Sequence, residues 1–195
     1  MAAGIAVNSG APGSKPAAAT DKARINLERA SILLVDTPLG VDVLSHVFYG
    51  FGARNLYRCR SAAEAMEVVA AHQLDLIITE ALLPDADAYE FVRAVRQSDE
   101  YESNRFVPVM LLSAHTAASK VVMSRDCGAN FFVAKPISPR VMMDRLLWVS
   151  REKRQYLQTD TYAGPDRRFH DEPLPEGVQG RRRNDPKIDA EEPET

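Results

Sequence analysis

The sequence has few of the features that mark secreted, zinc-binding or membrane-spanning proteins. Only two of its 195 residues are cysteines, Cys59 and Cys127, and they form no CxxC pair, so we expect free thiols in a reducing compartment. The four histidines lack the spacing of zinc ligands. No stretch approaches the roughly 20 continuous apolar residues of a membrane helix, and Gly, Pro and Ser interrupt the N-terminal segment where a signal peptide would be apolar. These absences predict a cytoplasmic protein with no membrane segment.

An excess of charge of one sign is also missing. The chain carries 24 Lys and Arg against 27 Asp and Glu, which gives a formal net charge of −3. No global field therefore favours nucleic acid or an anionic membrane. Any polyanion would have to be bound by a local cluster.

Apolar runs that alternate with amphipathic segments fill the middle of the chain. Each short run predicts a buried strand, and each is followed by apolar residues at helical spacing. Five strands alternating with five helices predict an α/β domain, a doubly wound parallel sheet with helices on both faces. The expected strands are 31–35, 55–59, 74–78, 106–112 and 131–134. The expected helices are 39–51, one that begins at the capping box of Ser61 and Glu64, one through 89–95, 119–127, and one from 138 to about 157.

The two ends of the chain differ in composition from this middle part. Residues 1–28 are typical of a flexible leader, and residues 153–195 have few large apolar side chains but many prolines and charges. Such a composition cannot form an independent core. We therefore expect a domain over 29–152 and a largely disordered tail after it.

Four polar residues stand where predicted strands end: Asp36, Glu80, Ser113 and Lys135. In open parallel sheets, ligands bind beyond the carboxyl ends of the strands. The segments Val35-Asp36, Ile77 to Asp87, Leu112-Ser113-Ala114 and Lys135-Pro136 together resemble the receiver domain of two-component response regulators. This resemblance implies the flavodoxin-like receiver fold with strand order 2-1-3-4-5, and a role in phosphorelay signal transduction.

Family chemistry needs an aspartate nucleophile, a Mg²⁺ held by carboxylates, and a lysine and a hydroxyl that contact the phosphoryl group. This sequence departs from that pattern at three positions. Glu80 replaces the phosphoacceptor aspartate, Thr37 replaces the second acidic residue of the first strand, and Ala88 replaces a glycine after the loop aspartate. With one carboxylate removed and another displaced, at most weak Mg²⁺ binding at Asp36 and Glu80 is expected. The sequence thus predicts a pseudo-receiver that is not an enzyme and needs no cofactor.

Three interpretations of Glu80 remain open. It can act as a fixed phosphate mimic that pairs with Lys135 and approaches Ser113, although it carries one negative charge rather than roughly 1.5 to 2. It can instead merely neutralise Lys135 in a site that no longer switches. A conventional phosphorylatable receiver is the third interpretation, because Asp36 and Lys135 are retained.

The resemblance also implies a switch and a partner surface. Ser113 and Phe132 occupy the switch positions, although a plain core role is the default interpretation of Phe132. The fourth helix, fifth strand and fifth helix would form the face that contacts a histidine kinase, a phosphotransferase or an effector. Candidate exposed residues on this face are Lys120, Arg125, Asp126, Arg140 and Asp144.

Two arginine clusters mark the tail, and no helix-turn-helix or other DNA-binding domain is visible there. Residues 158–195 hold six basic and ten acidic residues, a net charge of −4, which argues against binding by counterion release. Arginine forks suit phosphate and guanine. The tail also loosely resembles the arginine-rich tails of receiver-like proteins that bind a cyclic dinucleotide, which implies cyclic di-GMP as one candidate ligand. A solvated tail whose arginines pair with its own acidic end is the alternative. The candidate ligand residues are Arg167, Arg168, Arg181, Arg182 and Arg183.

Overall fold

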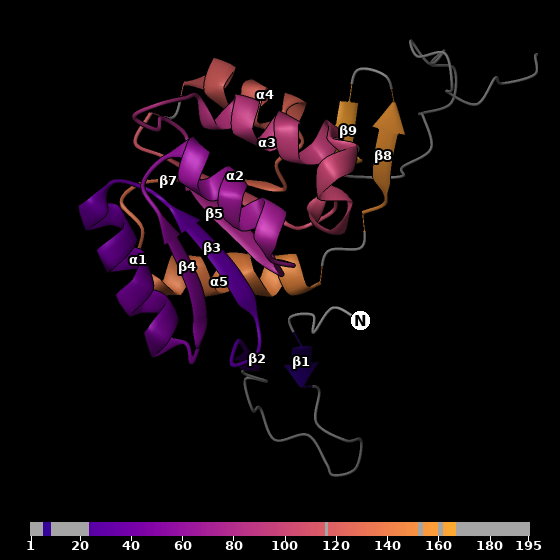
Figure 1. Cartoon of the computed structure of the whole chain (residues 1–195). Coiled ribbons are helices and arrows are strands. Elements are labelled where there is room, and N and C mark those ends of the chain that lie inside the picture. Colours follow the sequence, from indigo (N-terminus) through magenta and orange to yellow (C-terminus); the bar gives the residue numbers. More distant parts are fainter. Residues whose placement is uncertain (1–5, 9–23, 116, 152–153, 160–161, 167–195) are drawn as a thin grey trace, which may run out of the picture.

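A five-stranded parallel sheet lies at the centre of the computed structural model, which describes residues 6–8, 24–115, 117–151, 154–159 and 162–166 (Figure 1). Its strands run in the order β4-β3-β5-β6-β7, so the second strand of the sheet along the chain lies at one edge, beside the first. This is the predicted 2-1-3-4-5 order of the doubly wound fold, which is thereby confirmed. The strands are β3 (Ser31–Val35), β4 (Asn55–Cys59), β5 (Leu76–Glu80), β6 (Val109–Ser113) and β7 (Phe131–Ala134).

Helices cover both faces of the sheet (Figure 1). They are α1 (Pro38–Gly50), α2 (Ala62–Ala71), α3 (Ala88–Gln97), α4 (Ala118–Asp126), α5 (Pro139–Ser150) and the 3-10 helix η1 (Asp99–Asn104). Side chains alternate along a strand. Thus Leu34 of β3 packs with α1 and α5 in one core cluster, and its neighbour Leu33 packs with α2 and α3 in the other. Cys59 and Cys127 are both buried free thiols, and burial raises the pKa of each to about 11.

Two predicted strands begin later in the structure than the apolar runs suggest. The third starts at Leu76, after Asp75, whose carboxylate accepts a hydrogen bond from the backbone N–H of Ser31 at 2.9 Å. The fourth starts at Val109, after Pro108, and Phe106 remains half exposed. The starts at 74 and 106 were therefore wrong, whereas the strands themselves are present.

The N-terminal boundary predicted at residue 29 is too late. Leu27 is fully buried in the α1 and α5 core cluster, and strands β1 (Ala6–Asn8) and β2 (Arg24–Asn26) form a small antiparallel sheet before it. A single leucine before the first strand carries too weak a pattern to reveal this. Residues 1–5 and 9–23 of the predicted leader lie outside the described residues.

The C-terminal end of the domain also differs from the prediction. Helix α5 ends at Ser150 rather than near 157, and the chain then forms an antiparallel hairpin of β8 (Tyr156–Thr159) and β9 (Tyr162–Pro165). The Thr159 hydroxyl accepts from the Tyr162 N–H at 3.1 Å and donates to the Tyr162 carbonyl at 3.2 Å. A largely disordered tail from residue 153 was therefore wrong for these strands, whose tyrosines favour β structure. We call residues 156–165 the C-terminal hairpin.

A fully buried arginine joins the C-terminal hairpin to the sheet domain. Arg96 of α3 donates to the carbonyls of Gly128 at 3.1 Å and Arg105 at 2.7 Å, and to the side-chain oxygen of Asn130 at 3.3 Å. Its guanidinium also lies 5.5 Å from the ring centroid of Tyr156 in β8. Burial lowers the pKa of Arg96, as expected for a cation taken out of water. This contact with Tyr156, together with the hydrogen bond that the Asn130 side-chain amide donates to the Tyr156 hydroxyl at 3.0 Å, attaches the hairpin to the folded domain.

Close backbone contact fixes the hairpin at Gly128. This glycine follows α4 with a φ of +92°, and a Cβ atom built on it would lie 2.3 Å from the Ala163 carbonyl oxygen. Residues other than glycine rarely adopt that φ. A change of rotamer could not relieve the contact, because it does not move the Cβ atom away from the backbone oxygen. Only glycine therefore allows β9 to pack at this distance.

Replacing Gly128 with alanine should release the C-terminal hairpin. We expect a loss of about 2–3 kcal/mol in the free energy of unfolding, from the unfavourable φ together with the lost contact. Urea denaturation followed by circular dichroism measures this loss. Gly52→Ala is the matched control, because Gly52 also has a positive φ, of +89°, but nothing lies within 4 Å of its Cβ position. A loss at Gly128 no larger than that at Gly52 would mean that the contact contributes nothing.

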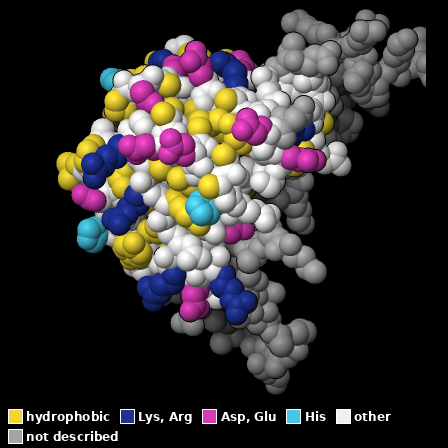
Figure 2. All heavy atoms as spheres, in the orientation of Figure 1, with side chains coloured by type: hydrophobic (Ala, Val, Ile, Leu, Met, Phe, Trp, Pro, Cys, Tyr) yellow, Lys and Arg dark blue, Asp and Glu magenta, His cyan; other side chains and the backbone are white. Residues whose placement is uncertain are grey.

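The surface carries both charge signs. On the face seen in Figure 2, acidic and basic side chains are interspersed with hydrophobic ones, without a continuous patch of one sign. This distribution agrees with the small net charge of the sequence. In the parts of the chain that the structure describes, no helix is both long and apolar enough to cross a membrane.

Candidate functional site

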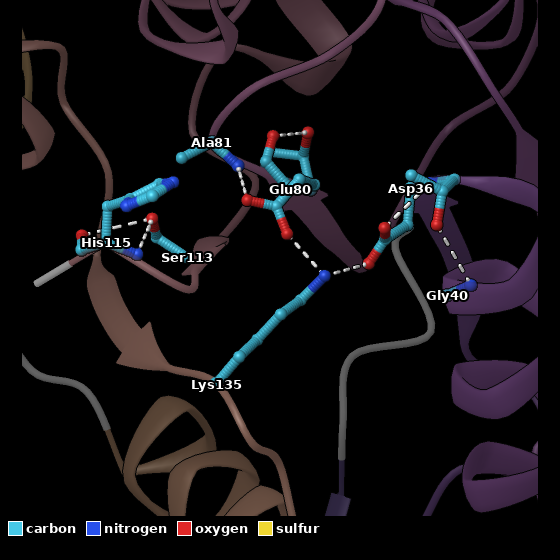
Figure 3. A network of polar contacts seen from close by, with 9 residues as sticks. Asp36, Gly40, Glu80, Ala81, Ser113, His115 and Lys135 are labelled. Carbon is cyan, nitrogen blue, oxygen red and sulfur yellow. Dashed lines mark hydrogen bonds and ion pairs between the residues drawn. The ribbon is translucent and has the colours of Figure 1, made fainter.

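Three charged side chains meet at the carboxyl end of the sheet (Figure 3). The Lys135 ammonium, just after β7, lies 2.7 Å from Asp36 Oδ2 and also forms an ion pair with Glu80 Oε2. Asp36 follows β3 and Glu80 ends β5, so neighbouring parallel strands bring both carboxylates to one lysine. We call these three residues the charged triad. The pairing of Glu80 with Lys135 that the sequence suggests is present.

Asp36 is the most enclosed member of the charged triad, with 1% of its surface exposed. Its Oδ1 accepts a hydrogen bond from the backbone N–H of Thr37 at 2.7 Å. Gly40, in the first turn of α1, passes so close that a Cβ atom there would lie 2.3 Å from the Asp36 carboxylate. Gly40 thus leaves room for the buried carboxylate, and sequence reasoning overlooked it because a glycine inside a helical segment gives no distinctive signal.

Glu80 is fixed at both carboxylate oxygens. One oxygen pairs with Lys135, and the other accepts the backbone N–H of Ala81 at 3.0 Å (Figure 3). The loop that follows is held by Asp85, whose carboxylate accepts from the N–H groups of Ala62 and Ala63 at the start of α2, at 2.9 and 3.0 Å. These bonds lower the pKa of Asp85. Glu80 therefore lies on a constrained segment.

The charge of Lys135 is stabilised by its partners. Burial by itself lowers the pKa of Lys135, but hydrogen bonds and Coulomb attraction from Asp36 and Glu80 outweigh it, and the net result is a raised pKa. A raised folded-state pKa contributes stability that is present below the unfolded value and is lost only as pH rises through the folded value. The lysine is thus cationic throughout the neutral range, and the two carboxylates share one positive charge.

Thr37 has a structural role at the position where an acidic residue would bind metal. Its hydroxyl accepts a hydrogen bond from the Gly40 N–H at 3.2 Å and so caps the N-terminus of α1, with Pro38 next in the chain. The Asp36 and Glu80 carboxylates share one lysine, and the Thr37 hydroxyl serves as a helix cap. These groups do not fit the set of oxygen donors that Mg²⁺ requires. Across the described ranges, no group of three or more His, Cys, Asp or Glu side chains could hold a metal ion.

Ser113 does not complete the predicted arrangement. Its hydroxyl donates to the His115 carbonyl at 3.1 Å and accepts from the His115 N–H at 3.0 Å, which closes a local turn after β6 (Figure 3). A hydroxyl has one hydrogen to donate, and here it goes to His115. The Ser113 hydroxyl therefore donates no hydrogen bond to Glu80. His115, which the sequence analysis did not single out, is the actual partner.

The remaining predicted residues fall into two groups. Phe132 is half-buried against the cluster that packs on α2 and α3, so its position is compatible with both a core and a switch role. On the face of α4, β7 and α5, Lys120 is half-buried with its ammonium 5.5 Å from the Tyr89 ring centroid. The exposed candidates on this face are Arg125, Asp126, Arg140 and Asp144. The five tail arginines from Arg167 to Arg183 lie outside the described residues.

Comparison with known proteins gives a consistent result. Residues 32–147 match the family described as the response regulator receiver domain. The chain is 28% identical over 136 residues to the transcriptional regulatory protein YvrH of Bacillus subtilis. The aligned region covers 69% of this chain and 54% of YvrH. It is 25% identical over 125 residues to a probable cyclic di-GMP phosphodiesterase of Vibrio cholerae, covering 62% of this chain and 26% of that protein. The chain spans about half or less of the curated relatives it matches.

Solved structures show the same fold. The chemotaxis protein CheY4 of Vibrio cholerae has a TM-score of 0.56 at 26% identity, covering 62% of this chain and 98% of CheY4. The signal receiver domain of a histidine kinase from Syntrophus aciditrophicus has a TM-score of 0.56 at 29% identity, covering 68% of this chain and 99% of that domain. Neither match extends over the whole of this chain.

Proposed function

Since the chain belongs to the response regulator receiver family of two-component signalling proteins, we propose that it is a pseudo-receiver that signals through protein contacts without being phosphorylated. The observation that carries the proposal is the charged triad, in which Glu80 is bound by both Lys135 and the Ala81 N–H; we assign Glu80 to the phosphoacceptor position. The longer side chain of glutamate fills space that a phosphoryl group would need. Thr37, which caps α1, supplies no charge to a metal.

The geometry favours a filled site over a full phosphate mimic. A mimic would engage both Lys135 and Ser113, but the Ser113 hydroxyl donates to His115. We propose that Glu80 supplies a fixed charge that neutralises Lys135 and keeps the domain in one state. On this account the chain has no catalytic activity and acts in the cytoplasm, through the surface of α4, β7 and α5, on a histidine kinase, a phosphotransferase or an effector.

A pull-down with the full chain as bait tests this proposal. Partner capture should be unchanged by Mg²⁺ and a small phosphodonor, and should be weaker with Glu80→Ala, because the neutralising charge is lost. Glu80→Asp should bind with intermediate strength. Equal capture by all three proteins would show that the charge at position 80 has no role in signalling.

Two valines with nearly the same exposure provide a matched test of the surface. Val122 of α4 is 52% exposed and Val43 of α1 is 53% exposed. Val122→Glu should remove most of the captured partner, whereas Val43→Glu should leave capture unchanged. The reverse result would place the contact surface on α1.

A further inference from the structure

A pocket of about 240 Å³ lies between the sheet domain and the C-terminal hairpin. Residues of α4, β7 and α5 form one side, and Tyr162 and Pro165 of β9 form the other. The match to the receiver family ends at residue 147. Beyond it lie Trp148, Arg154 and the hairpin residues. The pocket is thus completed by residues that lie outside the matched part of the chain. We call it the hairpin pocket.

The lining of the hairpin pocket is cationic and aromatic. Arg125, Arg145 and Arg154 line it, and none of the described residues that line it is acidic. The Arg145 guanidinium lies 5.9 Å from the Trp148 ring centroid, and that of Arg154 lies 5.8 Å from the Phe131 ring centroid. Trp148 is nevertheless 57% exposed. Arginines beside aromatic surfaces are suited to an anionic segment that also brings some apolar contact.

The chain's own sequence contains such a segment. Asp189 to Glu194 reads Asp-Ala-Glu-Glu-Pro-Glu, with four carboxylates and no basic residue. The segment begins 24 positions after Pro165, which lines the pocket, and a chain can extend by up to about 3.3 Å per residue. Length therefore places no limit on its return to the hairpin pocket.

We propose that the acidic segment 189–194 docks in the hairpin pocket and covers part of the α4, β7 and α5 surface. Its carboxylates pair with Arg145 and approach Arg125 and Arg154, which also have partners within the folded chain, and its alanine and proline contact the exposed face of Trp148. A segment in the same chain has an effective concentration on the order of a millimolar, so even weak pairing keeps the site occupied much of the time. The inference that docking hides a partner surface rests on the proposed function. The inference that the segment docks in the pocket does not rest on it.

The single tryptophan of the chain allows a direct test, because Trp148 lies in the pocket. The full-length protein is compared with a full-length variant carrying Asp189→Asn, Glu191→Gln, Glu192→Gln and Glu194→Gln. Quenching of tryptophan fluorescence by acrylamide, a neutral quencher, reports access to the ring. In low salt, the variant's quenching constant should be at least about twice that of the wild type if the segment shields Trp148 for half of the time or more.

Two controls separate docking from a general effect of charge. A second full-length variant neutralises four other tail acids, Asp171, Glu172, Glu176 and Asp185, and should be quenched like the wild type. In about 1 M salt, where the screening length falls to about 3 Å, the wild type should approach the variant lacking the 189–194 carboxylates. Equal quenching of all three proteins in low salt, or an equal rise in both variants, would overturn the proposal. Neither outcome bears on phosphorylation at Glu80, which is measured separately.

Discussion

Replacing Arg96 with alanine is expected to lower the free energy of unfolding by about 3–5 kcal/mol. The side chain is fully buried, and its removal leaves a cavity and deprives the Gly128 and Arg105 carbonyls of their donor. The Tyr156 ring also loses the cation that joins the C-terminal hairpin to α3. Urea denaturation measures the loss, and limited proteolysis should show cleavage near residues 156–165 before the rest of the domain.

Arg93 provides the control for this experiment. It lies one turn earlier on α3 and is exposed, so Arg93→Ala should change the free energy of unfolding by no more than about 0.5 kcal/mol. Arg96→Met should fall between the two, because methionine fills part of the space and removes the cost of burying a charge, but it donates no hydrogen bond. If Arg96→Ala were as stable as Arg93→Ala, the buried network would not hold the hairpin.

Replacing Lys135 with methionine should cost about 3 kcal/mol, since removing one partner of a buried ion pair leaves uncompensated charge. Asp36 and Glu80 would then repel each other with only 1% and 12% of their side chains exposed. Urea denaturation of the variant beside the wild type measures this loss.

A second substitution tests whether charge, rather than packing, causes the expected loss of stability at Lys135. Glu80→Gln added to Lys135→Met should restore roughly half of the lost stability, because it removes one of the two repelling charges. Lys120→Met is the control, since that lysine contributes only a cation–π contact worth about 0.5–1 kcal/mol. No recovery in the double variant would mean that the loss comes from packing rather than from charge.

The sequence carried enough information for the sheet and for the place of the site. Buried strands such as 31–35 and 131–134 have strong apolar patterns, and parallel strands necessarily bring their carboxyl ends to one edge. Asp36, Glu80 and Lys135 could therefore be expected to meet. The orientation of the Ser113 hydroxyl could not, because a serine can bond its own turn as readily as a neighbouring side chain.

The sequence pattern also could not predict contacts between segments that lie far apart in the chain. Arg96 reads as an ordinary polar residue of an amphipathic helix, and only the docked C-terminal hairpin makes it a buried one. Leu27 and Gly128 are similar cases, where one residue owes its role to a neighbour far along the chain. The tail's high content of charge and proline masked the short tyrosine-bearing strands that precede the arginine clusters.

Intact mass measurement tests most directly whether Glu80 prevents phosphorylation of this receiver domain. Wild-type protein is incubated with Mg²⁺ and acetyl phosphate beside a Thr37→Asp, Glu80→Asp variant that restores both carboxylates. We predict that the wild type gains no phosphoryl group, whereas the double variant gains one that Asp36→Ala then abolishes. A phosphoryl adduct on the wild type that disappears on substitution of Glu80 or Asp36 would contradict the account.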